Sequence, residues 1–247
     1  MRPLLFEDLS ASAAPELIMV GGQPGAGKTA ATVQAVRDLM CHGGGVAYIN
    51  GDELRPFHPR YATLVAADRS TAADKTGADV GLWVERAIRE AAAGRFHAVI
   101  ETTMRQPEVV RRTAEQFTAQ CFGFEIRVVV VDPEASQLGI YERFATGLTS
   151  PSALSRFTLP SYHADALAQM PKTLAEVAKL AKVVRFVDRQ GRELYSPRAS
   201  KVSPVKRLKT FGVSRCRTPS ASASQRIGPR WFCGWTATRC QPWFVRA

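Results

Sequence analysis

Long apolar segments, paired cysteines and acidic residues near the C-terminus are all scarce in this chain of 247 residues. Its apolar runs, such as residues 128–131, fall far short of the roughly 20 residues that a membrane-spanning helix needs. Glu7 and Asp8 stand where a signal peptide requires apolar residues, so we expect no secretion by that route. The five cysteines form no C-x-x-C pair, which disfavours a zinc site or a disulfide framework and favours reduced thiols in a cytoplasmic protein.

The lack of acidic residues is confined to one end of the chain. No Asp or Glu follows Glu193, and the whole net charge of +11 lies after residue 195. Residues 196–247 are rich in Ser, Pro and Arg without sustained periodicity, which is typical of an irregular tail with no core of its own. We therefore predict a folded domain over 1–195 and a basic tail over 196–247. Three interpretations of the tail stay open: an arm for nucleic acid or another anion, a segment that docks to a partner protein, or a non-homologous end created by a shifted reading frame.

Strand-like and helix-like segments alternate along the first 195 residues. Short apolar runs predict strands over 17–21, 46–50, 96–101, 124–132 and 182–188. Helical spacing predicts helices over 28–40, 81–94, 107–121, 133–147 and 161–181. This alternation predicts an α/β fold of three layers, with a mostly parallel central sheet of about five strands. Ligands of such sheets bind beyond the carboxyl ends of the strands, so the residues that follow each strand are candidates for chemistry.

The strongest motif follows the first predicted strand. Residues 22–29, GQPGAGKT, fill every fixed position of G-x-x-x-x-G-K-[ST] and open a predicted helix. Glycines let the backbone wrap a phosphate with its N–H groups pointing inward, and the helix N-terminus adds partial positive charge. We expect Lys28 to reach the β- and γ-phosphates of ATP, and the Thr29 hydroxyl to hold Mg²⁺. The predicted ATP-binding residues are Gly22, Gln23, Pro24, Gly25, Ala26, Gly27, Lys28 and Thr29.

Asp52, Arg55 and His58 follow the second predicted strand, in the segment NGDELRPFHP. A carboxylate at this edge can accept the proton of an attacking hydroxyl, which makes Asp52 a candidate general base. The alternative for Asp52 is a helix N-cap or an indirect partner of Mg²⁺. Arg55 is a candidate ligand for an anionic substrate group or, alternatively, a surface arginine. His58 precedes a proline and fits loop packing better than acid–base chemistry.

Glu101, Thr103 and Arg105 follow the third predicted strand, in the segment ETTMR. Alternation along an extended chain would send all three side chains to one side. A hydrogen-bond acceptor, a hydroxyl and a cation together suit a polar substrate with an anionic part. The alternative is an ion pair between Glu101 and Arg105.

Arg143 and Arg156 flank the loop TGLTSPSALS between two predicted helices. Arginines that lie over a phosphate loop neutralise charge during phosphoryl transfer, so both are candidate catalytic residues. Neither is specific alone, because a lone arginine is most often a solvated surface residue.

The order of these segments resembles that of the zeta toxin family, whose members are toxin kinases of bacterial toxin–antitoxin systems. The resemblance spans roughly residues 15–195 and is carried by GGQPGAGKT, GDELRPFHPRY, ETTMRQP, YERF and SRFTLPSYH. It implies a P-loop kinase-like fold and ATP-dependent phosphorylation of UDP-N-acetylglucosamine at the 3′-hydroxyl of the sugar. It also implies a cognate antitoxin, a small helical protein that occludes the ATP site.

The resemblance implies a role for most of the candidate residues. Asp52 matches the general base and Lys28 the phosphate-loop lysine, while Arg143 and Arg156 look like the pair that neutralises the transferring phosphate. The residues that fall on the substrate-binding segments are Arg55, His58, Glu85, Glu101, Thr103 and Arg105. Glu85 looks like the carboxylate that holds the sugar, although its position alone indicates a solvated helix residue.

Thr102 is a departure that bears on the acceptor, because the family often has glycine at this position. Some relatives use other nucleotides, including a dinucleotide cofactor, so a kinase of another nucleotide is the nearest alternative. Two further classes stay open. A P-loop NTPase that works as a switch or motor predicts hydrolysis without a phosphorylated acceptor. A nucleic-acid-binding module that works through the basic tail predicts binding that falls steeply with salt.

Overall fold

A six-stranded sheet runs through the middle of the domain, in the order β2-β3-β1-β4-β5-β6. The computed structural model describes residues 5–149, 157–196 and 202–211. Its strands are β1 Glu16–Gly21, β2 Val46–Ile49, β3 His97–Thr102, β4 Gly123–Val129, β5 Val183–Val187 and β6 Glu193–Tyr195. Strands β1 to β5 pair in parallel, and β6 pairs antiparallel with β5. The predicted mostly parallel sheet is therefore confirmed, with β6 added at its edge.

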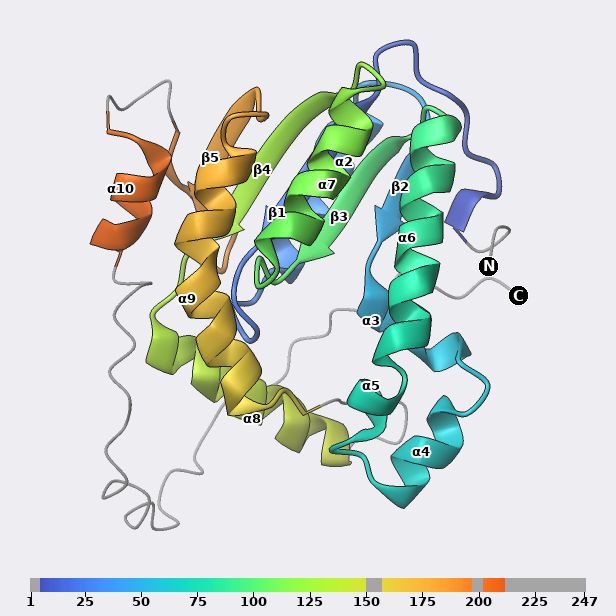
Figure 1. Ribbon diagram of the computed structural model, residues 1–247, viewed down its shortest axis with the longest axis vertical. Helices are drawn as coiled ribbons and strands as arrows, with labels where there is room; N and C mark the ends of the chain where they lie inside the picture. The colour runs from blue at the N-terminus through green and yellow to red at the C-terminus, as the bar shows by residue number, and fades with distance from the viewer. Residues whose placement is uncertain (1–4, 150–156, 197–201, 212–247) are drawn as a thin grey trace. The chain divides into compact units, whose positions relative to one another are not determined.

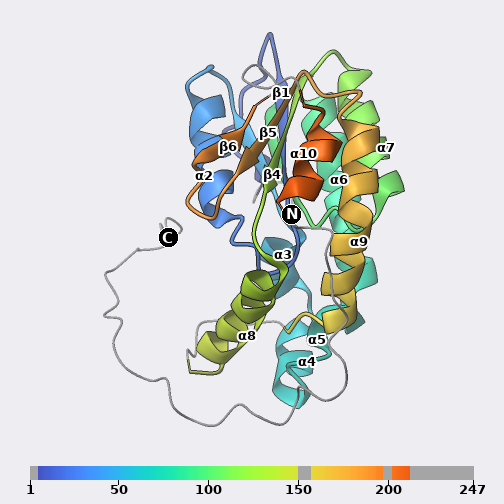
Figure 2. The same cartoon turned by 90° about the vertical axis from the view of Figure 1, so that its left-hand side faces the viewer.

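Helices cover both faces of the sheet and produce the predicted three layers (Figure 1). The edge-on view in Figure 2 shows α2 on one face and α6, α7 and α9 on the other. The helices are α2 Thr29–Met40, α3 Gly51–Leu54, the 3-10 helix η1 Arg55–Phe57, α4 Tyr61–Ala67, α5 Ala72–Lys75, α6 Gly77–Ala93, α7 Pro107–Thr118, α8 Pro133–Thr149, α9 Pro160–Val177 and α10 Pro204–Thr210. None of the helices in the described ranges is both long enough and apolar enough to span a bilayer.

Strand β1 shows why the sheet is covered on both faces. Its side chains from Leu17 to Val20 are only 0–2% exposed, as expected for a central parallel strand. Leu17 and Met19 belong to the core under α6, α7 and α9, whereas Ile18 and Val20 belong to the core against α2. The period of two along a strand therefore divides one short apolar run between two cores.

The packed part of the chain continues past the boundary predicted at residue 195. Helix α10 is capped by Ser203, and its Leu208 is fully buried in the same core as α9. The Tyr195 hydroxyl donates a hydrogen bond to the Val202 carbonyl at 2.6 Å. Apolar residues such as Leu208 and Phe211 attach this segment to the domain, although basic residues dominate its composition. The rest of the predicted tail, 212–247, lies outside the described residues.

Candidate active site

A cavity of about 300 Å³ lies where the phosphate loop meets the residues that follow β2 and β3. It is lined by Pro24, Gly25, Gly27, Lys28, Thr29, Asp52, Glu101, Gly139, Arg143 and Arg189. These residues come from segments that are far apart in the sequence, and the parallel strands bring them to one edge of the sheet. The structure therefore places Lys28, Thr29, Asp52, Glu101 and Arg143 around one cavity.

The phosphate loop adopts a conformation that its glycines permit. Gly25 and Gly27 have φ values of 76° and 77°, in the region that side chains with a Cβ rarely adopt. The Lys28 ammonium lies over the loop, 3.3 Å from the Gly22 carbonyl and 3.5 Å from the Gln23 carbonyl. Phosphate oxygens carry negative charge, so they would offer this ammonium shorter and stronger hydrogen bonds than these two carbonyls do.

A buried polar chain connects the phosphate loop to α8 and α9. The Gln23 side chain is fully buried, and its Nε2 donates to the Val131 carbonyl at 2.8 Å and to Ser136 Oγ at 3.3 Å. Ser136 Oγ lies 2.8 Å from His163 Nε2 on α9. Burial lowers the pKa of the His163 imidazole, which favours its neutral form.

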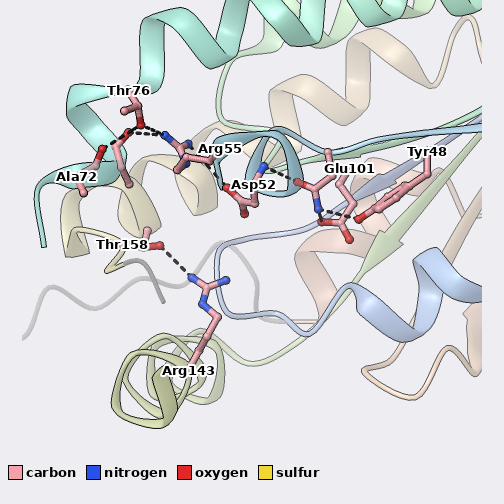
Figure 3. Close-up of polar contacts among 10 residues, drawn as sticks. Tyr48, Asp52, Arg55, Ala72, Thr76, Glu101, Arg143 and Thr158 are labelled. Carbon is pink, nitrogen blue, oxygen red and sulfur yellow. Dashed lines mark hydrogen bonds and ion pairs between the residues drawn. The ribbon is translucent and has the colours of Figure 1, made fainter. Parts of the chain in front are cut away.

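Asp52 lies in the first turn of α3 (Figure 3). The N-cap of this helix is Asn50, whose Oδ1 accepts a hydrogen bond from the Asp52 N–H at 2.9 Å. The capping role that was an alternative for Asp52 therefore belongs to Asn50. The Asp52 side chain is 36% exposed, and the Arg55 Nη2 lies 3.9 Å from its Oδ1. A carboxylate that lines the cavity in this way can meet a bound substrate.

Arg55 and His58 are both buried, so the alternative that Arg55 is a surface arginine is wrong. Arg55 Nη1 donates to the Ala73 carbonyl at 2.5 Å and to Thr76 Oγ1 at 2.8 Å. His58 Nε2 lies 2.9 Å from the Asp79 carboxylate. These contacts hold the segment after β2 against α5 and α6, and neither residue lines the cavity.

Glu101 is held by a neighbour on α2 and by neighbours in and next to β2, and Figure 3 shows the latter side. Its Oε1 accepts a hydrogen bond from Thr32 Oγ1 at 2.7 Å, and its Oε2 accepts one from Asn50 Nδ2 at 3.1 Å. Asn50 Nδ2 also donates to the Tyr48 hydroxyl at 2.7 Å. Burial, followed by the charge of Glu101, raises the pKa of the Tyr48 phenol well above its ordinary value. The carboxylate is therefore fixed by this network rather than by an ion pair with Arg105.

The alternation expected beyond Glu101 stops when β3 ends at Thr102. Met104 has a φ of 55°, and its N–H donates to Thr102 Oγ1 at 3.1 Å, which turns the chain. Arg105 stacks with its Cζ 4.3 Å from the ring centre of Tyr162 on α9. Thr103 and Arg105 therefore do not line the cavity.

Of the remaining predicted site residues, Arg143 lines the cavity and Glu85 does not, while Arg156 is not among the described residues. Arg143 lies on α8 and lines the cavity, and its Nη2 donates to Thr158 Oγ1 at 3.2 Å (Figure 3). Glu85 lies on α6 with an exposed side chain and does not line the cavity. Arg156 falls outside the described residues.

Arg189 is a cavity residue that the sequence analysis missed. Its Nη2 lies 2.9 Å from the Gly25 carbonyl and 2.7 Å from the Ala135 carbonyl. It follows β5, so the rule that singled out the residues after β2 and β3 could have found it at the end of the last parallel strand.

The cavity residues also fit a nucleotide that carries Mg²⁺. Partial desolvation, followed by the negative charges of Asp52 and Glu101, raises the pKa of the Glu53 carboxyl. A divalent cation relieves such crowding of carboxylates, and the Thr29 hydroxyl lines the same cavity. Within the described ranges, no three or more His, Cys, Asp or Glu are arranged to hold a metal.

The fold and the cavity define an α/β protein of the P-loop kinase-like type. A family model described as "Zeta toxin" matches residues 5–200, and the chain belongs to the zeta toxin family. It is 27% identical over 194 residues to Toxin zeta of Enterococcus hirae, covering 78% of this chain and 67% of that one. It is 28% identical over 130 residues to Toxin PezT of Streptococcus pneumoniae serotype 4, covering 53% of this chain and 50% of that one.

Two solved structures have a similar fold. A chain of the PezAT chromosomal toxin–antitoxin system of Streptococcus pneumoniae matches with a TM-score of 0.70 at 20% identity, covering 84% of this chain and 82% of that one. A chain of the AvrRxo1-ORF1:-ORF2 complex matches with a TM-score of 0.57 at 10% identity, covering 83% of this chain and 66% of that one. At these identities the likeness supports the fold alone.

Proposed function

We propose that this protein is an ATP-dependent phosphotransferase that phosphorylates the 3′-hydroxyl of the sugar in UDP-N-acetylglucosamine and acts as the toxin of a toxin–antitoxin system. The observation that carries the proposal is the cavity itself, in which Lys28, Arg143 and Asp52 surround one space. Cations and a carboxylate around one cavity suit transfer of a phosphoryl group to a hydroxyl. Membership of the zeta toxin family supports the toxin role.

In the proposed reaction the phosphate loop, Asp52, the arginines and Thr29 have separate tasks. The backbone of residues 22–29 and the Lys28 ammonium bind the phosphates of ATP. The Asp52 carboxylate accepts the proton of the acceptor hydroxyl as that oxygen bonds to the γ-phosphorus, and the bond from this phosphorus to the β–γ bridging oxygen breaks and releases ADP. Lys28 and Arg143, together with Arg156, stabilise the charge on the transferring group. Mg²⁺, held through Thr29, supplies further neutralisation of the phosphates when it is bound.

Among the proposed acceptor-binding residues, Glu101 has the most direct support because it lines the cavity. Arg55 and His58 act in this proposal by holding the segment that carries Asp52. Thr103, Arg105 and Glu85 would contact parts of the nucleotide sugar that extend beyond the cavity.

The partners and the location of the protein are part of the same proposal. We propose a cytoplasmic protein that is neutralised by a cognate antitoxin, and the similar PezAT structure, which comes from a toxin–antitoxin system, supports this partner. Nucleic acid is proposed only as a ligand of the basic segment after residue 195.

Mass spectrometry of the purified protein with Mg·ATP and a mixture of nucleotide sugars and dinucleotide cofactors tests the proposal. We expect a gain of one phosphate on UDP-N-acetylglucosamine. This gain should be lost in Asp52→Asn and kept in Asp165→Asn, which alters an exposed carboxylate on α9. A phosphate on another nucleotide would keep the kinase and replace the acceptor. Loss of ATP without any phosphorylated acceptor would contradict the kinase and favour an NTPase.

A further inference from the structure

Arg189 lies in a tight turn between β5 and β6 that aligns it with the phosphate loop. Asp188 fixes this turn, because its Oδ1 accepts hydrogen bonds from the N–H groups of Gln190 and Arg192, both at 2.9 Å. Asp188 Oδ2 also accepts one from Arg192 Nε at 2.6 Å. No step of the proposed reaction uses Arg189, although it lines the cavity.

The guanidinium of Arg189 joins two segments that are distant in the sequence. Its Nη2 donates to the Gly25 carbonyl in the phosphate loop and to the Ala135 carbonyl in the first turn of α8. Hydrogen bonds from a charged donor are roughly twice as strong as neutral ones. Its Nε is buried and has no hydrogen-bond partner in the part of the chain that the structure describes, so Nη2 makes the connection.

The two joined segments also touch through their backbones. A Cβ on Gly25 would lie 1.9 Å from the Ser136 carbonyl oxygen, and a Cβ on Gly139 would lie 2.7 Å from the Gly25 carbonyl oxygen and 3.1 Å from Arg189 Nη2. The loop and α8 are therefore in direct contact, with no room for side chains between them. Arg143 follows Gly139 by four residues and so lies on the same side of the helix, where it lines the cavity.

We propose that Arg189 is a positioning residue for phosphoryl transfer: it ties the phosphate loop to the first turn of α8 and thereby fixes Arg143 relative to Lys28. The 17-residue helix α8 carries both the Ala135 carbonyl that Arg189 contacts and the side chain of Arg143. A shift of its first turn would therefore move the Arg143 guanidinium. A displacement of about 1 Å at a reacting centre can cost about 100-fold in rate. The inference rests on the proposed kinase function, and one of its tests is independent of that function.

The kinetic test compares Arg189→Ala and Arg189→Lys with Arg111→Ala. Arg111 is the matched control, because it forms ion pairs with Glu108 and Glu115 on α7 and does not line the cavity. We expect Arg189→Ala to lower kcat by about 10- to 100-fold while the Kd for ATP changes by less than about threefold. Lysine should restore part of the loss, since an ammonium can still reach a carbonyl. Unchanged kcat, or a loss confined to ATP affinity, would overturn the proposal.

A double-mutant cycle with Arg143→Ala tests whether Arg189 acts through Arg143. If it does, Arg189→Ala should cost less than about threefold in the Arg143→Ala background, because residues that share one task are not additive. The full loss in both backgrounds would show that Arg189 acts without Arg143 and would contradict the positioning role.

Amide hydrogen exchange of the protein without substrate separates this inference from the proposed function. We expect amides over 136–143 to exchange faster in Arg189→Ala than in the original chain, and to be unchanged in Arg111→Ala. This result would support the connection even if the phosphoryl acceptor proved to be different. Equal exchange in all three proteins would overturn the connection, whichever reaction the protein catalyses.

Discussion

The two halves of the cavity are built in different ways. The half that we propose for the nucleotide is built from backbone, because the phosphate loop packs so closely on α8 that Gly25 and Gly139 have no space for a side chain. The half that we propose for the acceptor is built from side chains, because Thr32 and Asn50 fix the Glu101 carboxylate. Close backbone contact requires glycine and therefore leaves a visible motif, whereas a hydrogen-bond network is made from ordinary polar residues and leaves none. The two halves should respond differently to substitution.

Lys28→Ala should have the largest effect, and it should affect both ATP affinity and turnover. Removal of one group that stabilises transition-state charge costs about 10²–10³-fold in kcat. We expect a weaker Kd for ATP as well, because the same ammonium lies over the phosphate loop. Steady-state kinetics and calorimetric titration with ATP check this. Lys172→Ala, at an exposed position on α9, should match the original chain. ATP consumption that is unchanged in Lys28→Ala would refute the phosphate-loop assignment.

Gly25→Ala should weaken ATP binding, whereas Gly43→Ala, the matched control, should not. Gly25 and Gly43 have φ values of 76° and 73°, so alanine is strained by about 1–2 kcal/mol at either position. Only at Gly25 would the new Cβ also meet backbone, whereas nothing lies within 4 Å at Gly43. We expect ATP affinity to fall by about tenfold or more in Gly25→Ala alone, since the loop must move. Equal affinities in the two variants would show that contact with α8 does not shape the loop.

Thr32→Val should weaken the acceptor half by a smaller amount. The substitution removes the hydroxyl that donates to Glu101 at 2.7 Å and leaves a half-buried carboxylate short of a partner, at a cost of about 1–3 kcal/mol. We expect lower stability in urea and a higher KM for the acceptor, with ATP affinity unchanged. Thr113→Val removes an exposed hydroxyl on α7 and should stay within about 0.5 kcal/mol of the original chain. A selective loss of ATP affinity in Thr32→Val would contradict the division into halves.

Mild acid should lower the free energy of unfolding through protonation of His163, and we expect this effect to be the smallest of the four. Burial lowers the pKa of this imidazole below its ordinary value of 6.5, so the unfolded chain binds the proton more readily. Stability is therefore present above pH 6.5 and is lost as pH falls toward the folded-state pKa, at no more than about 1.4 kcal/mol per pH unit. Urea unfolding between pH 7.5 and about 5.5 should show a shallower decline in His163→Gln. Parallel declines in the two proteins would exclude His163 as the cause.

Much of the fold could be predicted from the sequence, because its determinants are local. Continuous apolar runs such as 17–20 predict buried parallel strands, and the helices after them keep a clear period. The short strand β6 and helix α10 could not be predicted in the same way. Both depend on packing against β5 and α9, and α10 lies among basic residues that hide its buried Leu208.

The residues of the candidate site also divide into those that local sequence predicts and those that depend on the turn or contact around them. The phosphate loop and Asp52 follow strands directly, so motif and position predict them. Arg105 could not be placed, because the turn at Met104 interrupts the alternation from which its direction was expected. Arg189 follows β5 and could have been found by the same rule, but its hydrogen bond to the Gly25 carbonyl and the contact of Thr32 with Glu101 join distant segments, which no spacing in the sequence records.

The proposed role of Asp52 in phosphoryl transfer is best tested by transfer of the γ-phosphate from labelled ATP, measured beside ATP binding in Asp52→Asn. We expect the original chain to move the label to UDP-N-acetylglucosamine. Asp52→Asn should bind ATP within about threefold of the original chain but transfer the label about 10²–10⁴-fold more slowly, as loss of a general base does. Transfer at the original rate by Asp52→Asn, or release of all the label as inorganic phosphate by the original chain, would contradict it.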